Sequence, residues 1–167
     1  MINKNEIFRF FENIKSNIQK KDLENLLKKS NKLLEKVSKD GKLSKYVNQI
    51  ELLIQMLRDY ISKDYSKLPW KTIASIASVL IYILMPADII PDFIPILGVA
   101  DDIFILTAVW KLIEEDIKEY ALWKLRNLPQ DDEIADQIIN TISKAFPNLL
   151  PIKKAIEENK IKNRTKE

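Results

Sequence analysis

The sequence contains no cysteine and no histidine, and only two of its 167 residues are glycine. The lack of cysteine excludes disulfides and thiolate chemistry, and the lack of both residues excludes zinc sites of the Cys/His type. Without histidine the chain also lacks the usual proton shuttle near neutral pH and the serine–histidine relay of many hydrolases. Any metal ion would therefore need oxygen ligands. A cysteine-free chain also fits a reducing compartment.

Strand signals are absent as well, whereas Leu, Ile, Lys and Glu are abundant and apolar residues recur at helical spacing. The sequence therefore predicts an all-α fold, a helical bundle of about six to seven helices around a central apolar helical hairpin with an Asp/Pro-rich turn. We expect Gly41 to end the second helix in a left-handed cap conformation. The first three expected helices cover residues 4–19, 22–38 and about 43–62. Residues 65–71 open the fourth, which includes the uncharged residues 72–87, and the fifth runs from Asp101 or Asp102 to about residue 127. The sixth starts around residues 131–133 and ends at 146, and a short last helix covers about 151–162.

The chain length suits one domain with a smaller appendage. We expect an amphipathic helical region over residues 1–66, an apolar core over 67–128, and helices with a tail over 129–167. Charge is uneven along the chain, because residues 1–67 carry 15 Lys/Arg against 9 Asp/Glu and residues 68–130 carry 5 against 8. The basic flank could touch phosphates of DNA or lipid alike, but acid around an apolar centre disfavours a nucleic-acid binder.

The stretch from Tyr82 to Asp102 is unlike an ordinary surface loop. It holds four aspartates, three prolines and one of the two glycines in otherwise apolar sequence. A polar turn does not need Ile, Phe and Leu at every free position, so we expect a rigid turn buried in protein or in lipid. Residues 72–87, just before the first aspartate, carry no charge, and small hydroxyl residues at helical spacing there favour close contact with another helix.

The four aspartates are Asp88, Asp92, Asp101 and Asp102. In the favoured interpretation they are structural: Asp88 and Asp92 accept hydrogen bonds from backbone N–H groups in two consecutive turns, and Asp101 or Asp102 caps the next helix. In the alternative, the four carboxylates converge and need a cation, for which hard oxygen ligands favour Mg²⁺, Ca²⁺ or Mn²⁺. That alternative predicts a divalent-metal-binding protein or a metal-dependent enzyme.

The pattern of this stretch resembles the signature of the YkvA-like family, also called domain of unknown function 1232. The resemblance covers residues 70–113, and the helices on either side look like additions to it. It implies a small helical protein, often associated with membranes, and it carries no established activity. The matching residues are Tyr82, Pro86, Asp88, Pro91, Asp92, Phe93, Pro95, Gly98, Asp101 and Asp102.

The apolar hairpin fits two environments. In the first it dips into a bilayer, with Lys67 and Lys71 before it and Lys111 and Lys118 after it on the cytoplasmic side. In the second it is the buried centre of a bundle and is wrapped by the three amphipathic amino-terminal helices. Both environments remain open from the sequence alone.

These features favour a non-enzymatic helical protein that acts as a membrane-associated or protein-interaction module. The expected partners are an anionic membrane surface, a second copy of the chain or another protein. The first 15 residues mix charge with Phe and Ile, so we expect no signal peptide. The expected location is therefore the cytoplasm or the cytoplasmic face of a membrane.

Overall fold

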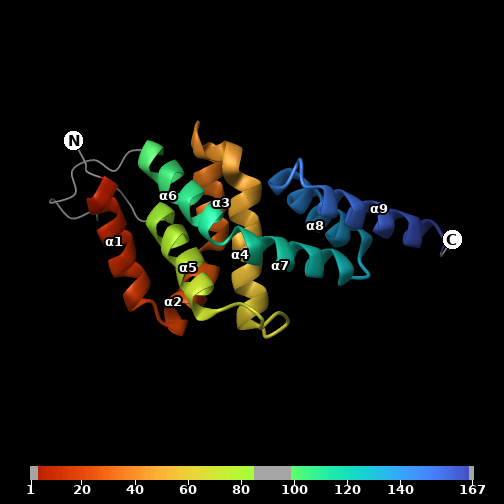
Figure 1. Cartoon of the computed structure of the whole chain (residues 1–167), viewed down its shortest axis with the longest axis horizontal. Helices are drawn as coiled ribbons and strands as arrows, with labels where there is room; N and C mark the ends of the chain where they lie inside the picture. Colours follow the sequence, from red (N-terminus) through yellow and green to blue (C-terminus); the bar gives the residue numbers. More distant parts are fainter. Residues whose placement is uncertain (1–3, 85–98, 166–167) are drawn as a thin grey trace.

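A computed structural model describes residues 4–84 and 99–165 of the chain. These residues form nine α-helices and one short 3-10 helix without any strand, which confirms the predicted all-α class. Figure 1 shows the amino-terminal helices and the carboxy-terminal helices at opposite ends of the long axis, with α4 between them. The elements are α1 (Lys4–Asn17), α2 (Lys20–Lys28), α3 (Ser30–Lys39), η1 (Leu43–Tyr46), α4 (Val47–Ile61), α5 (Trp70–Leu84), α6 (Val99–Leu112), α7 (Glu114–Arg126), α8 (Asp132–Ala145) and α9 (Leu150–Arg164).

Two helices that the sequence predicts as continuous are each divided in two. The segment expected over residues 22–38 divides at Lys29, where φ is −97° and ψ is 5°, into α2 and α3. The segment expected over residues 101–127 divides at Ile113, where φ is −110° and ψ is 15°, into α6 and α7. Apolar side chains stay buried on both sides of each break. The chain therefore changes direction around the bundle without losing its apolar face.

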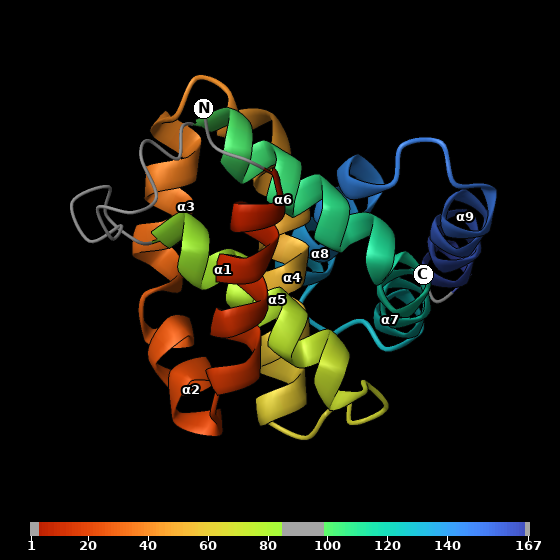
Figure 2. The same cartoon turned by 60° about the vertical axis from the view of Figure 1, so that its left-hand side comes forward.

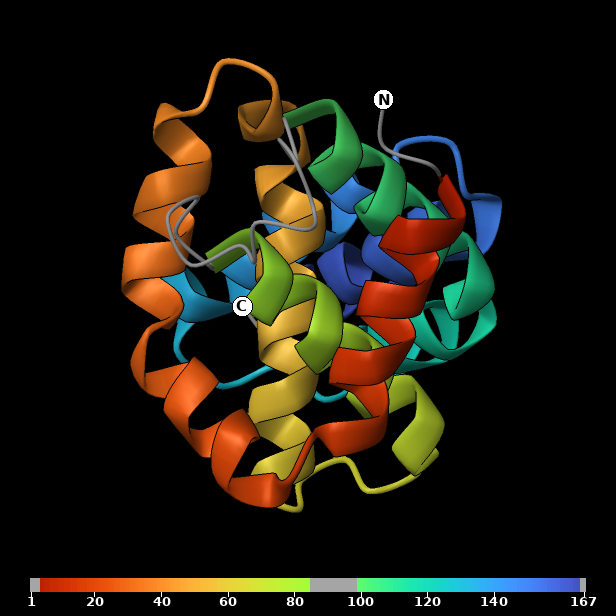
Figure 3. The ribbon, with the colours of Figure 1, turned by 90° about the vertical axis from the view of Figure 1, so that its left-hand side faces the viewer.

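The apolar helix α5 lies inside the amino-terminal part of the bundle. It contacts α1, α2, α3, α4 and α6, and Figure 3 shows α1 on one side of it and α2 with α3 on the other. Residues 72–80 are all buried. Ser75 Oγ and Ser78 Oγ donate hydrogen bonds to the carbonyl oxygens of Lys71 and Ala74, at 2.7 and 2.6 Å. Because these hydroxyls are satisfied within the helix, neighbouring helices can pack closely on them.

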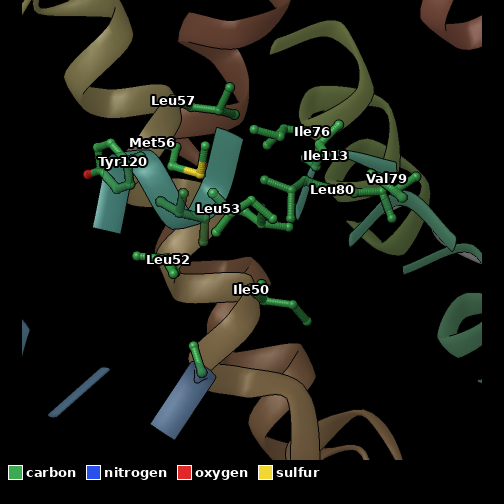
Figure 4. Close-up of a cluster of buried hydrophobic side chains, with 14 of the residues drawn as sticks. Ile50, Leu52, Leu53, Met56, Leu57, Ile76, Val79, Leu80, Ile113 and Tyr120 are labelled. Atoms are coloured by element: carbon green, nitrogen blue, oxygen red, sulfur yellow. The ribbon is translucent and has the colours of Figure 1, made fainter. Parts of the chain in front are cut away.

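Helix α4 connects the two ends of the molecule. It contacts α2, α3 and α5 on one side and α8 on the other, while α7, α8 and α9 pack together. Figure 4 shows Leu53 of α4 beside Leu80 of α5, and Met56 on the side of α4 that faces Tyr120 of α7. All four of these side chains are fully buried. No helix among residues 4–84 and 99–165 is both long enough and apolar enough to cross a membrane.

A carboxylate, rather than a glycine, holds the turn after α3. The predicted left-handed cap at Gly41 is wrong, because no described glycine has a positive φ. Asp40 Oδ1 instead accepts hydrogen bonds from the backbone N–H groups of Leu43 and Lys42, both at 2.9 Å. These two bonds favour the charged form of the carboxyl, and they lower the pKa of Asp40 from its ordinary value.

We expect Asp40→Asn to lower the free energy of unfolding at about pH 7 and to have no effect at about pH 2. The native pKa is the lower one, so the stabilisation is complete above the ordinary value of 3.8 and is lost as the pH falls through the native value. Urea unfolding of the wild-type protein and of Asp40→Asn at the two pH values measures the difference in their free energies of unfolding. An equal difference at both pH values would show that the carboxylate charge is not the cause.

Candidate functional site

The structure describes only part of the predicted aspartate cluster. Asp88 and Asp92 lie outside the described residues, as does the side chain of Asp101. Asp102 is half-buried in the first turn of α6. Within residues 4–84 and 99–165, no three acidic side chains gather in a way that could hold a metal ion. The metal site therefore stays a prediction, as does the rigid buried turn.

The cap predicted at the start of the second apolar helix is misplaced. Helix α6 begins at Val99, so Asp101 and Asp102 lie inside its first turn and neither occupies the N-cap position. Carboxylates in a first turn still interact favourably with the positive end of the helix dipole. Helices α5 and α6, which flank the undescribed stretch, pack against each other.

The carboxyl end of α5 is held by a lysine from another helix. Lys36 of α3 donates a hydrogen bond from Nζ to the carbonyl oxygen of Ile83 at 2.6 Å. Ile83 lies among the last four residues of α5, whose carbonyl groups have no partner within the helix. An ammonium group also suits the negative end of the helix dipole. The amino-terminal helices thus place positive charge where the aspartate- and proline-rich stretch begins.

Lys36 belongs to a lysine-rich surface that follows α2, α3 and η1. Every lysine of this segment is exposed, while its apolar residues, such as Leu23, Leu33 and Val37, are buried against the bundle. The nine lysines outnumber four acidic residues over residues 20–45. The lysine-rich surface consists of Lys20, Lys21, Lys28, Lys29, Lys32, Lys36, Lys39, Lys42 and Lys45.

Three of the four acidic side chains in this segment make local interactions. Asp22 Oδ2 accepts a hydrogen bond from the backbone N–H of Gln19 at 2.8 Å, as part of the capping box that starts α2. Asp40 binds the turn before η1. Glu35 pairs with Lys39 at 2.7 Å on the outside of α3. The carboxylates therefore serve the helix ends and one surface pair, and the segment keeps a net charge of +5, nine positive against four negative.

A polar network joins α4 to α7 in the carboxy-terminal half of the bundle. Asp59 Oδ2 accepts hydrogen bonds from Tyr120 Oη at 2.5 Å and from Lys124 Nζ at 2.7 Å. Tyr120 and Lys124 are four residues apart and so share one side of α7. Asp59 is only 7% exposed, and Tyr120 is fully buried. Because both partners of Asp59 lie on α7 and donate to the same carboxylate oxygen, the network connects α4 to α7.

The surroundings keep Tyr120 protonated. Burial, followed by the hydrogen bond to Asp59, raises the pKa of Tyr120 above its ordinary value. The ring of Tyr65 packs edge-on against Tyr120 at 5.2 Å between centroids, and the ring of Trp123 lies at 5.8 Å. Sequence reasoning missed this network because 61 and 65 residues separate Asp59 from its two partners. The spacing of Tyr120 and Lys124 was visible in the sequence, but it does not identify Asp59.

Comparisons with known proteins match the same central region. Residues 72–108, which span most of α5 and α6 and the stretch between them, match the family described as "Protein of unknown function (DUF1232)". Over 82 residues the chain is 39% identical to the "Uncharacterized membrane protein YkvA" of Bacillus subtilis (strain 168). This alignment covers 49% of the chain and 77% of that protein. No solved structure matches the chain.

Proposed function

Because the chain belongs to the YkvA-like family of proteins of unknown function (DUF1232), we propose that it is a non-enzymatic helical protein that associates with an anionic membrane surface. The printed name of the Bacillus subtilis relative, an uncharacterized membrane protein, supports an association with membranes. Anionic lipids are concentrated in the cytoplasmic leaflet, which makes the cytoplasmic face of a membrane the proposed location.

The observation that carries this proposal is the lysine-rich surface of α2, α3 and η1. Its nine lysines are exposed on one continuous segment of the chain and outnumber the acidic residues by five. Each lysine close to an anionic surface contributes about 1 kcal/mol of attraction. Several lysines acting together are therefore sufficient for measurable binding without insertion of a helix.

The packing of α5 favours contact at the surface of the bilayer over insertion of this helix. Its residues 72–80 are buried against other helices, so exposing them to lipid would require α1, α2 and α3 to move away. Thr72 Oγ1 also donates a hydrogen bond to Asp116 Oδ2 of α7 at 2.5 Å. Residues 72–80 of α5 are thus enclosed by protein, which supports the second environment considered for the hairpin.

We expect Lys28→Gln/Lys32→Gln/Lys42→Gln to weaken binding to anionic vesicles by roughly a hundredfold, since three lysines contribute about 3 kcal/mol. Glutamine keeps a similar helix propensity, so the fold should be retained. Flotation with vesicles of phosphatidylcholine, with and without phosphatidylserine, measures the partition coefficient.

A matched control is Lys144→Gln/Lys153→Gln/Lys154→Gln, which removes the same charge from exposed positions of α8 and α9. We expect this control to bind nearly as well as the wild-type protein. Equal losses in the two triple variants would show that only net charge matters. No binding of the wild-type protein to anionic vesicles would reject the proposed function.

A further inference from the structure

A cleft lies at the amino-terminal end of α5, the end opposite the one that leads into the aspartate- and proline-rich stretch. Figures 2 and 3 show that α2, the end of α4 and the start of α5 come together there, at the bottom of both views. The volume of the cleft is about 400 Å³. Its walls come from α2, the last turn of α4, the connecting loop and the first residue of α5. The lining residues are Lys20, Tyr60, Ile61, Lys63, Ser66 and Trp70.

Lys63 adopts an unusual backbone conformation in this wall. Among the described residues it is the one non-glycine residue with a positive φ, 65°. It follows the end of α4, and its N–H donates a hydrogen bond to the carbonyl oxygen of Tyr60 at 3.2 Å. Glycine takes this conformation without the steric cost of a Cβ atom, and it is the usual residue after a helix end. A lysine in this conformation has a steric cost that glycine would avoid, and such strained positions are typical of functional sites.

The lining of the cleft combines positive charge, hydroxyl groups and an exposed aromatic ring. The lining residues include two lysines, Lys20 and Lys63, and two residues with hydroxyl groups, Tyr60 and Ser66. Ammonium and hydroxyl donors together are the groups that bind phosphate oxygens. The carboxylate of the neighbouring Asp64 accepts a hydrogen bond from Ser62 Oγ at 2.8 Å, and Asp64 is not one of the lining residues.

Trp70 distinguishes this cleft from a simple anion site. Its side chain is 45% exposed, which is unusual for the largest amphipathic residue, while Ile61 adds apolar surface to the same wall. Indole rings favour the boundary between lipid headgroups and acyl chains. Lys20 belongs both to the cleft and to the lysine-rich surface, so one membrane contact can include the two.

We propose that this cleft binds the phosphate group of an anionic phospholipid, with Lys20 and Lys63 on the phosphate and Trp70 at the lipid interface. This inference rests on the proposed association with anionic membranes and names a site for the lipid phosphate. The loop of residues 62–69 and the start of α5 also carry the exposed Lys67 and Lys71, which add to the positive potential at the cleft.

The test compares Lys20→Gln/Lys63→Gly with a control of equal charge, Lys144→Gln/Lys153→Gln, in the full chain. With vesicles that contain phosphatidic acid, we expect the first variant to bind about 25-fold more weakly, a factor of about five for each lysine. The control should change by about twofold or less. Because glycine relaxes the backbone at residue 63, the thermal midpoint of a Lys63→Gly single variant should equal or exceed that of the wild type.

Tryptophan fluorescence provides an independent measurement at the same site. Emission of the wild-type protein should shift to shorter wavelength with these vesicles, and Trp70→Phe should remove the shift. Equal binding of the cleft variant and its control would overturn the cleft site while the lysine-rich surface remains supported by its own variant. The same fluorescence shift with millimolar glycerol phosphate would overturn a lipid as the occupant. Failure of the wild-type protein to bind any anionic vesicle would instead reject the proposed function itself.

Discussion

Asp59→Ala is expected to lower the free energy of unfolding by about 3–5 kcal/mol, the cost of breaking a buried charged pair by removing one partner. The change leaves the fully buried hydroxyl of Tyr120 without its acceptor, and it leaves the ammonium of Lys124 without the carboxylate that lies 2.7 Å away. It also removes the hydrogen bonds that connect α4 to α7. Urea unfolding followed by circular dichroism measures the loss.

Two further variants separate the network from a general effect of lost charge. Asp136→Ala removes an exposed carboxylate from α8 and should change stability by no more than about 0.5 kcal/mol. Asp59→Ala combined with Lys124→Met should recover part of the loss, because the second change removes the unpaired charge. If Asp59→Ala were as mild as the surface control, the network would not stabilise the fold.

Leu80→Ala is expected to cost about 2–5 kcal/mol, the range for truncating a buried leucine. Leu80 is fully buried on α5, and it lies beside Leu53 of α4 in Figure 4. Stability falls for two reasons: the variant buries fewer carbon atoms when it folds, and a cavity remains where the leucine side chain was. Denaturant unfolding in the absence of lipid and detergent measures it.

This prediction also tests whether other helices enclose α5 in water. Leu112→Ala is the matched control, because Leu112 is 61% exposed on α6 and its truncation should change stability by about 0.5 kcal/mol or less. A small effect of Leu80→Ala would indicate that α5 does not pack on α4 in solution. It would favour the alternative in which the apolar hairpin enters the bilayer.

The environment of the hairpin illustrates where sequence reasoning ends. An uncharged run over residues 72–87 fits either lipid or a protein core, because both are apolar. The choice depends on whether the amphipathic amino-terminal helices cover the run, and periodicity within each helix does not say which surface its apolar face meets. In the structure α1, α2 and α3 all contact α5.

The sequence also did not predict the breaks at Lys29 and Ile113. The apolar spacing continues through both positions, so a continuous helix and a bent pair of helices predict the same buried residues. Similarly, Gly41 had the residue type of a left-handed cap, yet Lys63 has the positive φ. Residue type sets a preference, and packing of the neighbouring helices decides whether the chain follows it.

The sequence by itself determined the all-α class, most helix positions and the family signature around Tyr82 and Asp102. These features depend on residues within one or two turns of each other, so local order is sufficient to specify them. Only the tertiary structure decided the partners of Asp59, the contact of Lys36 with Ile83 and the cleft beside Lys63. Those contacts join helices that are distant along the chain, and they exist only once the apolar faces have packed in one particular arrangement.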